Sequence, residues 1–207
     1  MVEQLVEQDP HVGDRTDDPA APDWKAALGA ELDRAIVQGG RRWSRGLMAV
    51  AWIHLIAFLV CHALHSPSKD SDPRHILVWF IELVAVFVAM RAIAGRGWFW
   101  SPPAIHLVGR LWLTLLILSF SLSTLNATIG WETLWFKAAW GTLSSFFFAV
   151  LAWLYTPKFL ILAVQMYLTA LLMARFMDWN NLIYGVSWWL ALMGIAWTIR
   201  RRERGVA

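Results

Sequence analysis

ILVWFIELVAVFVAMR, residues Ile76 to Arg91, is the stretch that decides the fold of this chain. It is an almost unbroken apolar run in which Glu82 is the one acidic residue. A helix of this length crosses much of the ~30 Å hydrocarbon layer of a membrane at ~1.5 Å per residue. A carboxylate at that depth is costly unless it has a partner. The stretch therefore predicts a membrane helix and makes Glu82 a candidate functional residue.

The rest of the chain has the same apolar character. Of its 207 residues, 58% are hydrophobic and 16% are charged, whereas a soluble domain is about a quarter charged. We therefore predict an all-α polytopic integral membrane protein, with a six-helix transmembrane domain at residues 46–199. The six predicted spans are Gly46–Leu64, Ile76–Ile93, Ala104–Leu125, Lys137–Tyr155, Lys158–Phe176 and Leu182–Ile199.

Basic residues lie mostly on one side of the predicted membrane. The positive-inside rule then places both termini in the cytoplasm and predicts the cell (inner) membrane as the location. Because the charges lie at helix ends, they do not indicate nucleic-acid binding. Residues 200–207 are interpreted as a basic cytoplasmic tail. The basic side carries Arg41, Arg42, Arg45, Arg91, Arg96, Arg110, Lys158, Arg200, Arg201, Arg202 and Arg204, and the opposite side carries Lys69, Arg74, Lys137 and Arg175.

Two segments precede the first span. Residues 1–22 are acidic and are predicted to be a disordered cytoplasmic tail, because they cannot bury enough apolar area. Residues 23–40 are predicted to form an amphipathic helix, with Asp23 as N-cap and Gly39-Gly40 ending it. Its apolar stripe fits the membrane interface or the cytoplasmic face of the bundle, and a partner protein binding residues 23–38 is the alternative. The stripe consists of Trp24, Leu28, Leu32 and Ile36.

The polar residues of the first three spans predict an intramembrane site. At ideal helical rise His54 lies about 13 Å from the inner end of its helix, Glu82 about 16 Å and Arg110 about 10 Å. These similar depths make His54 and Arg110 candidate partners of Glu82. The functional interpretation is a proton or ion relay or a polar pocket. The structural one is a buried network, or a protonated Glu82 that bonds across helices.

A second group of side chains predicts a weaker metal site. His62 and His65 form an HxxH pair near the outer end of the first span, and His75 follows at the start of the second. Two histidines at that spacing can chelate a metal. The pair alone is a short and common match, so interfacial histidines are the other interpretation.

The fourth span carries small residues at Gly141, Ser145 and Ala149. Small residues four apart allow two membrane helices to approach closely. We expect this ridge to pack against the fifth span across the tight turn between them. A homo-oligomer contact is the alternative.

The sequence predicts no cofactor. His54 and His62 differ by ~80° in direction on one helix, and His106 lies at another depth, so the chain does not predict a b-type haem. Signatures of hydrolases, zinc proteases, nucleotide-binding loops and dithiol enzymes are not found. The many tryptophans, 15 in all, are interpreted as interfacial anchors and packing residues.

Two function classes remain after these exclusions. The first is a small transport, channel or sensing protein that uses the polar site of the first three helices. The second is a non-catalytic membrane subunit or scaffold, and an intramembrane enzyme comes third. The two leading classes differ in one expectation: a transport or sensing site lines a cavity, whereas a structural network is sealed in a dry core.

Overall fold

The computed structural model describes residues 23–64, 73–97, 103–129 and 136–206. The tail predicted for residues 1–22 lies outside the described residues. Within the described ranges the chain is all-α, without strands. Its elements are α1 (Trp24–Ala63), α2 (Pro73–Ala94), α3 (Pro103–Ile129), α4 (Phe136–Leu154), α5 (Phe159–Arg175), the short 3₁₀ helix η2 (Met177–Trp179) and α6 (Asn180–Val206).

Five of these helices are long and apolar enough to cross a membrane, which confirms the class of all-α membrane protein. They include most of α1 and all of α4. The predicted span Lys158–Phe176 corresponds to α5, which is apolar but only 17 residues long. A sixth crossing by α5 therefore stays a prediction.

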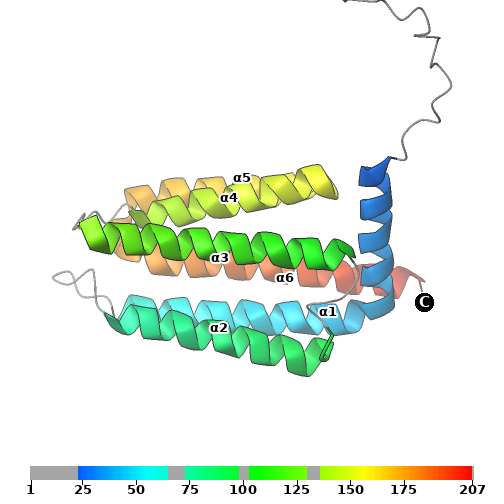
Figure 1. Ribbon diagram of the computed structural model, residues 1–207, viewed down its shortest axis with the longest axis horizontal. Helices are drawn as coiled ribbons and strands as arrows, with labels where there is room; N and C mark the ends of the chain where they lie inside the picture. Colours follow the sequence, from blue (N-terminus) through cyan, green and yellow to red (C-terminus); the bar gives the residue numbers. More distant parts are fainter. Residues whose placement is uncertain (1–22, 65–72, 98–102, 130–135, 207) are drawn as a thin grey trace, which may run out of the picture.

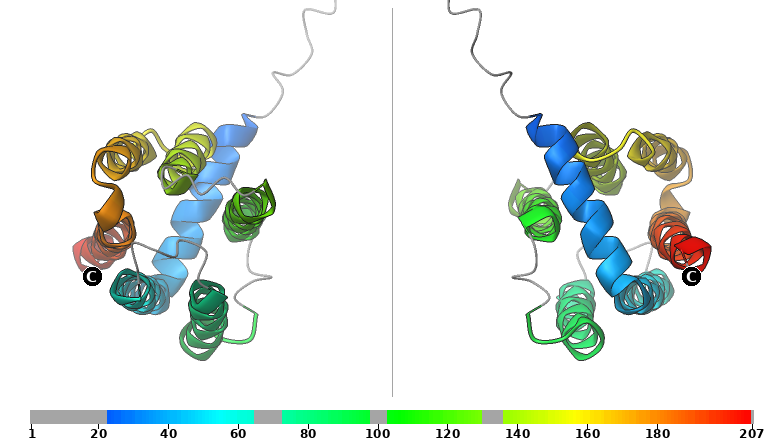
Figure 2. Two further views of the ribbon diagram at one scale, coloured as in Figure 1. Left: turned by 90° about the vertical axis from the view of Figure 1, so that its left-hand side faces the viewer. Right: turned by 90° about the vertical axis from the view of Figure 1, so that its right-hand side faces the viewer.

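The helices form a ring in the order of the sequence, which Figure 2 shows end-on. Close packing joins α1 to both α2 and α6, and α4 to both α3 and α5. Helices α2 and α3 are in much looser contact with each other than these pairs are. Two pairs of aromatic rings cross this junction, Phe87 with Trp112 at 6.1 Å and Trp79 with Phe120 at 6.3 Å between centroids. We call this loosely packed junction the α2–α3 seam.

Helix α1 continues through Gly39-Gly40, contrary to the prediction that the pair ends an amphipathic helix. Figure 1 shows that the first part of α1 lies across the end of the bundle and that the second part runs along it. A glycine pair is a common site of helix bending, because it lets the helix axis turn without loss of the helical backbone. Asp23 does cap the helix: its Oδ1 accepts hydrogen bonds from the backbone N–H groups of Lys25 and Ala26.

The first part of α1, residues 24–38, is the cap segment, and the end of the bundle that it crosses is the cap end (Figures 1 and 2). Its stripe faces the bundle, since Ala35 is buried and Leu32 and Ile36 line the interior. Trp24 is 57% exposed. A partner protein for residues 23–38 stays a prediction, and the exposed Trp24 is a large apolar side chain that such a partner could cover.

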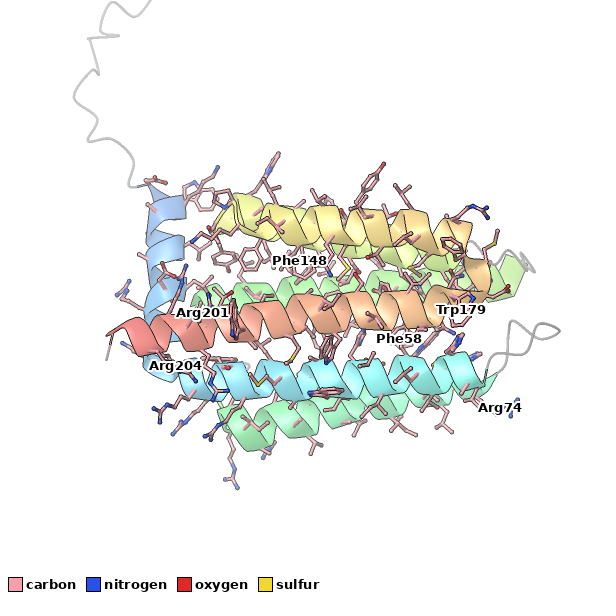
Figure 3. The ribbon with its side chains drawn as sticks, turned by 180° about the vertical axis from the view of Figure 1, so that it is seen from behind. Phe58, Arg74, Phe148, Trp179, Arg201 and Arg204 are labelled. Carbon is pink, nitrogen blue, oxygen red and sulfur yellow. The ribbon has the colours of Figure 1, made fainter. Side chains whose placement is uncertain are left out.

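The C-terminal basic residues belong to α6, which continues to Val206; that residues 200–207 form a basic cytoplasmic tail stays a prediction. Arginine is a good helix former, and its charge is favoured near a helix C-terminus. Arg202 also donates to Asp33 of the cap segment at 2.6 Å. Figure 3 shows Arg201 and Arg204 at the cap end and Arg74 at the opposite end, which we call the far end.

Helices α4 and α5 meet along the ridge of small residues. A Cβ atom on Gly141 would lie 2.9 Å from the Cα of Ala170, so the two helices touch backbone to backbone there. Ser145 donates a hydrogen bond to the carbonyl oxygen of Ala163 at 2.8 Å. This face of α4 is therefore occupied by α5, as expected for the first of the two predicted packing modes.

We expect Gly141→Ala to destabilise the protein by about 1–3 kcal/mol, because the added methyl meets helix backbone that cannot move aside locally. The measurement is the free energy of unfolding in mixed detergent micelles titrated with SDS. Gly194→Ala is the matched control, since a Cβ at Gly194 meets nothing within 4 Å. Alanine there should be neutral or stabilising, because it has the better helix propensity. Equal effects of the two substitutions would contradict the close α4–α5 contact.

At the cap end, Tyr155 follows α4 and contacts both α3 and the cap segment of α1. Its phenol donates a hydrogen bond to the carbonyl oxygen of Ala104 in the first turn of α3, and its own carbonyl lies beside Gly29 of the cap segment. Burial, with a smaller contribution from the charge of Glu31, raises the pKa of Tyr155 to about 12. The neutral phenol is therefore favoured in the folded state.

We expect Tyr155→Phe to lower the free energy of unfolding by about 1 kcal/mol below pH 10, because one hydrogen bond is lost. The folded-state pKa of Tyr155 is raised above its usual value near 10. The stabilisation is therefore complete below pH 10 and declines as the pH rises through 12. The difference between wild type and variant should shrink over that range in an SDS titration at several pH values. A constant difference would contradict the burial of this phenol.

Candidate functional site

The helices line a partly open cavity of about 340 Å³, within the range of small-molecule sites in proteins. Lining residues on α3 run from Ile105 to Ser123, about 27 Å along the axis at ~1.5 Å per residue. Leu32 and Ile36 of the cap segment line the same space. Figure 3 shows Phe58 and Phe148, two further lining residues, between the helices.

The lining of α2 follows helical periodicity. Trp79, Glu82, Leu83, Val86 and Met90 face the cavity, and they recur at the three- and four-residue spacing of one helix face. The carboxylate of Glu82 is thus on the inner face of α2, among apolar neighbours. It follows that Glu82 is a cavity group and not one exposed to lipid.

Glu82 meets His54 of α1 across the cavity wall. The distance from His54 Nδ1 to Glu82 Oε1 is 2.5 Å, and the two side chains are 18% and 12% exposed. The imidazole ring is surrounded by aromatic rings, with centroids at 4.6 Å for Phe58, 5.7 Å for Trp188 and 6.1 Å for Tyr184. A short contact with a polar partner is how a membrane helix retains a carboxyl group in apolar surroundings.

Arg110 does not join this pair, contrary to the prediction from depth. It is exposed, and its Nε donates to His106 Nε2, one turn earlier on the same helix, at 3.3 Å. At ~100° per residue Arg110 points about 150° away from the centre of the cavity-lining face of α3. The prediction rests on depth alone, whereas rotation about the helix axis decides which side chains meet. A guanidinium on an outward face extends toward the nearer membrane surface.

The three histidines predicted as a weak metal site are not brought together by any described contact. His75 Nε2 lies 3.2 Å from the carbonyl oxygen of Cys61. The ring of His62 stacks on Trp179 with centroids 5.2 Å apart. His65 lies outside the described residues, so the complete set stays a prediction. Among the described residues no three His, Cys, Asp or Glu side chains gather as a metal site.

Sequence reasoning missed a polar cluster beside the pair, on α4 and α6. Ser144 Oγ lies 2.8 Å from Tyr184 Oη and accepts a hydrogen bond from Trp188 Nε1 at 3.2 Å. Ser144 also donates to the carbonyl oxygen of Trp140. The residues that meet are 40 and 44 positions apart. A local sequence pattern cannot predict such contacts, because a single serine, tyrosine or tryptophan in an apolar helix is also typical of ordinary packing.

The fold and the cavity together define a class: an all-α membrane protein with a ligand-sized cavity between its helices, lined by a carboxylate–imidazole pair. Comparison of the chain with protein-family models, with curated proteins and with solved structures finds no match.

A double-mutant cycle tests the pair. We expect Glu82→Gln and His54→Gln each to cost about 3 kcal/mol, because each leaves a buried polar partner uncompensated. The double variant should cost less than the sum, with a coupling energy of about 1–3 kcal/mol. The measurement is the free energy of unfolding by SDS titration in micelles.

Arg110→Gln is the control for this cycle. Because Arg110 is on the outward face of α3 and bonds to His106, its substitution should not couple to Glu82→Gln. A coupling energy as large as that of the His54 cycle would mean that Arg110 reaches the carboxylate after all.

Proposed function

We propose that this protein takes up a lipid-soluble molecule from the bilayer into its cavity and holds the polar group of that molecule at the His54–Glu82 pair. The observation that carries the proposal is the placement of this pair in a cavity lined almost entirely by apolar side chains. Such a site serves transport or sensing, the first of the two function classes that the sequence left open.

The apolar lining favours a lipid-soluble molecule over an ion. An ion path needs a succession of polar groups or water, because an ion in hydrocarbon is very costly. Between the His54–Glu82 pair and the far end, the hydroxyls of Ser119 and Ser123 on α3 donate to carbonyl oxygens of their own helix. A channel for ions is therefore the less supported member of this class.

The α2–α3 seam supplies the route of access. The other neighbours in the ring are packed closely, while this junction is bridged by aromatic rings. Trp79 and Trp112 also line the cavity, so the seam forms part of its wall. Movement of two or three side chains would open the cavity to lipid without unfolding a helix.

We infer further that the cap end faces the cytoplasm and that the membrane is the cell (inner) membrane. Supporting this orientation, exposed arginines gather at the cap end on α1 and α6, among them Arg41, Arg42, Arg200, Arg201 and Arg204. The positive-inside rule associates such a cluster with the cytoplasmic surface.

Locking the seam tests the proposed route. In a Cys61→Ala background, which removes the single cysteine, Phe87→Cys and Trp112→Cys would be joined by a short bismaleimide. A diazirine derivative of hexadecane in the vesicles would then be photolysed, and labelled residues identified by mass spectrometry. Labelling of the cavity residues Leu116 and Ser119 should fall severalfold after cross-linking.

Two controls accompany this experiment. Ile117 and Leu118 are exposed on the outside of α3, so their labelling should stay unchanged. The second control joins α1 to α6 through Trp52→Cys and Trp189→Cys, because the rings of Trp52 and Trp189 already pack with centroids 5.4 Å apart. Cross-linking this pair should leave the labelling of the cavity unchanged. A cavity that is never labelled, even with the seam free, would favour the scaffold function instead.

A further inference from the structure

The outer side of the bundle carries a second feature of interest, where α1 and α6 pack side by side in opposite directions (Figure 1). The rings of Trp52 and Trp189 meet there with centroids 5.4 Å apart, and Trp52 is 50% exposed. At ~100° per residue Trp52 points about 160° away from the centre of the cavity-lining face of α1. This contact therefore marks the lipid-facing side of the α1–α6 junction.

The register of the two helices brings one arginine of each to the same level. Arg41 precedes Trp52 by eleven positions, and Arg200 follows Trp189 by eleven positions. Eleven residues make about three turns and about 16 Å of helix, so each arginine points within about 20° of the direction of its tryptophan. Because the helices run in opposite directions, both arginines lie on the cap-end side of the tryptophan contact. Arg41 and Arg200 are thus level with each other on the outer flank of the junction.

This level corresponds to the surface of the hydrocarbon layer. On α1, Trp52 lies about 16 Å from Arg41 and also about 16 Å from Ala63, where the helix ends at the far end. The tryptophan contact is therefore close to the middle of a hydrocarbon layer ~30 Å thick. Arg41 and Arg200 then lie at the edge of that layer, where the phosphates of phospholipids begin.

Arg41 and Arg200 are both exposed, and among the described residues neither has a carboxylate within ion-pair distance. Their neighbour Arg202 differs, since it is paired with Asp33 of the cap segment at 2.6 Å. Helices in close contact have axes about 8–10 Å apart. Two long side chains on adjacent helices can therefore reach one anion between them, and no acidic group of the described protein occupies that role.

The surface below the two arginines is apolar. On α1, Trp52, Ile56 and Leu59 are 50%, 56% and 44% exposed, and on α6 Leu190 is 52% exposed. A free phosphate ion would use the arginines alone. A phospholipid would use the arginines with its head group and the apolar surface with its acyl chains, so the combination favours a lipid.

We propose that an anionic phospholipid binds at the outer flank of the α1–α6 junction, with its phosphate between Arg41 and Arg200 and its acyl chains along Trp52. Guanidinium groups bind phosphate oxygens through paired hydrogen bonds. Basic side chains beside membrane helices recognise anionic head groups through their charge. This site lies outside the cavity, so it is independent of the proposed uptake of a lipid-soluble molecule.

Lipid binding to the full chain in nonionic detergent micelles tests the site, measured by native mass spectrometry. The probes are phosphatidylglycerol and phosphatidylcholine with identical acyl chains. A basic side chain near an anionic head group strengthens binding roughly fivefold. Phosphatidylglycerol should therefore bind about tenfold more tightly than phosphatidylcholine. In the double variant Arg41→Gln/Arg200→Gln this preference should fall to about twofold or less.

Arg42→Gln/Arg201→Gln is the matched control, because it removes the same charge from the next position on each helix. Gly40 and Glu203 mark the contact of α1 with α6, since a Cβ on Gly40 would meet the side chain of Glu203. Arg42 and Arg201 are each two residues from that contact and point about 160° away from it. Both are exposed, and this control should keep the preference for phosphatidylglycerol. Thermal unfolding followed by circular dichroism reports whether each variant is folded.

Four results would overturn the proposal. They are equal binding of the two lipids, an unchanged preference in Arg41→Gln/Arg200→Gln, and an equal loss in both double variants, which would mean diffuse attraction by the basic surface. The fourth is displacement of phosphatidylglycerol by inorganic phosphate at millimolar concentration, which would indicate a site for the free ion. If phosphatidylglycerol binds only after the acidic residues among residues 1–22 are changed to amides, that segment is the occupant and the lipid site is also ruled out.

Discussion

A carboxylate and an imidazole within an apolar cavity can be retained only if they meet, and this contact constrains the rotation of two helices. The 2.5 Å contact between His54 and Glu82 sets which face of α1 and which face of α2 turn inward. The apolar lining of both helices then follows from helical periodicity. Helix α2 is held by α1 and has no comparable backbone contact with α3, which leaves the ring loosest at the seam. The contact of α2 with α1 thus positions the polar pair, and the weak contact of α2 with α3 leaves the seam.

The other side of the ring has a different physical basis. Helices α4, α5 and α6 pack through small residues and buried hydroxyls, with Gly141 against Ala170 and Gln165 donating to Ser187. Membrane helices gain little from burying apolar side chains against each other, because lipid is equally apolar, so close backbone contact and hydrogen bonds carry their association. The ring is thus closely packed on the side of α4, α5 and α6 and loosely packed at the α2–α3 seam.

Several features could be predicted from the residues alone. The length and apolarity of the segments placed the chain among helical membrane proteins, and the segment boundaries agree with α2, α3 and α4 to within a few residues. The depths of His54 and Glu82 were also estimated correctly enough to pair them. Arg110 shows the limit of that method, since a depth estimate contains no information on rotation. The spacing of His106 and Arg110, four residues apart, was the available signal for their contact on one face of α3.

The sequence by itself determined what each helix needs: an apolar surface to lipid, a partner for the carboxylate of Glu82 and a cap at Asp23. These are local requirements, set by the cost of polar groups in hydrocarbon and of unpaired backbone at helix ends. Only the tertiary structure decided that α1 bends and closes one end of the bundle. It also decided that Ser144 meets Tyr184, that Arg110 faces outward and that a cavity lies between the helices. The physical reason is that nearly every face of these helices is apolar, so the pattern cannot specify rotation. Contacts between residues far apart in the chain choose it.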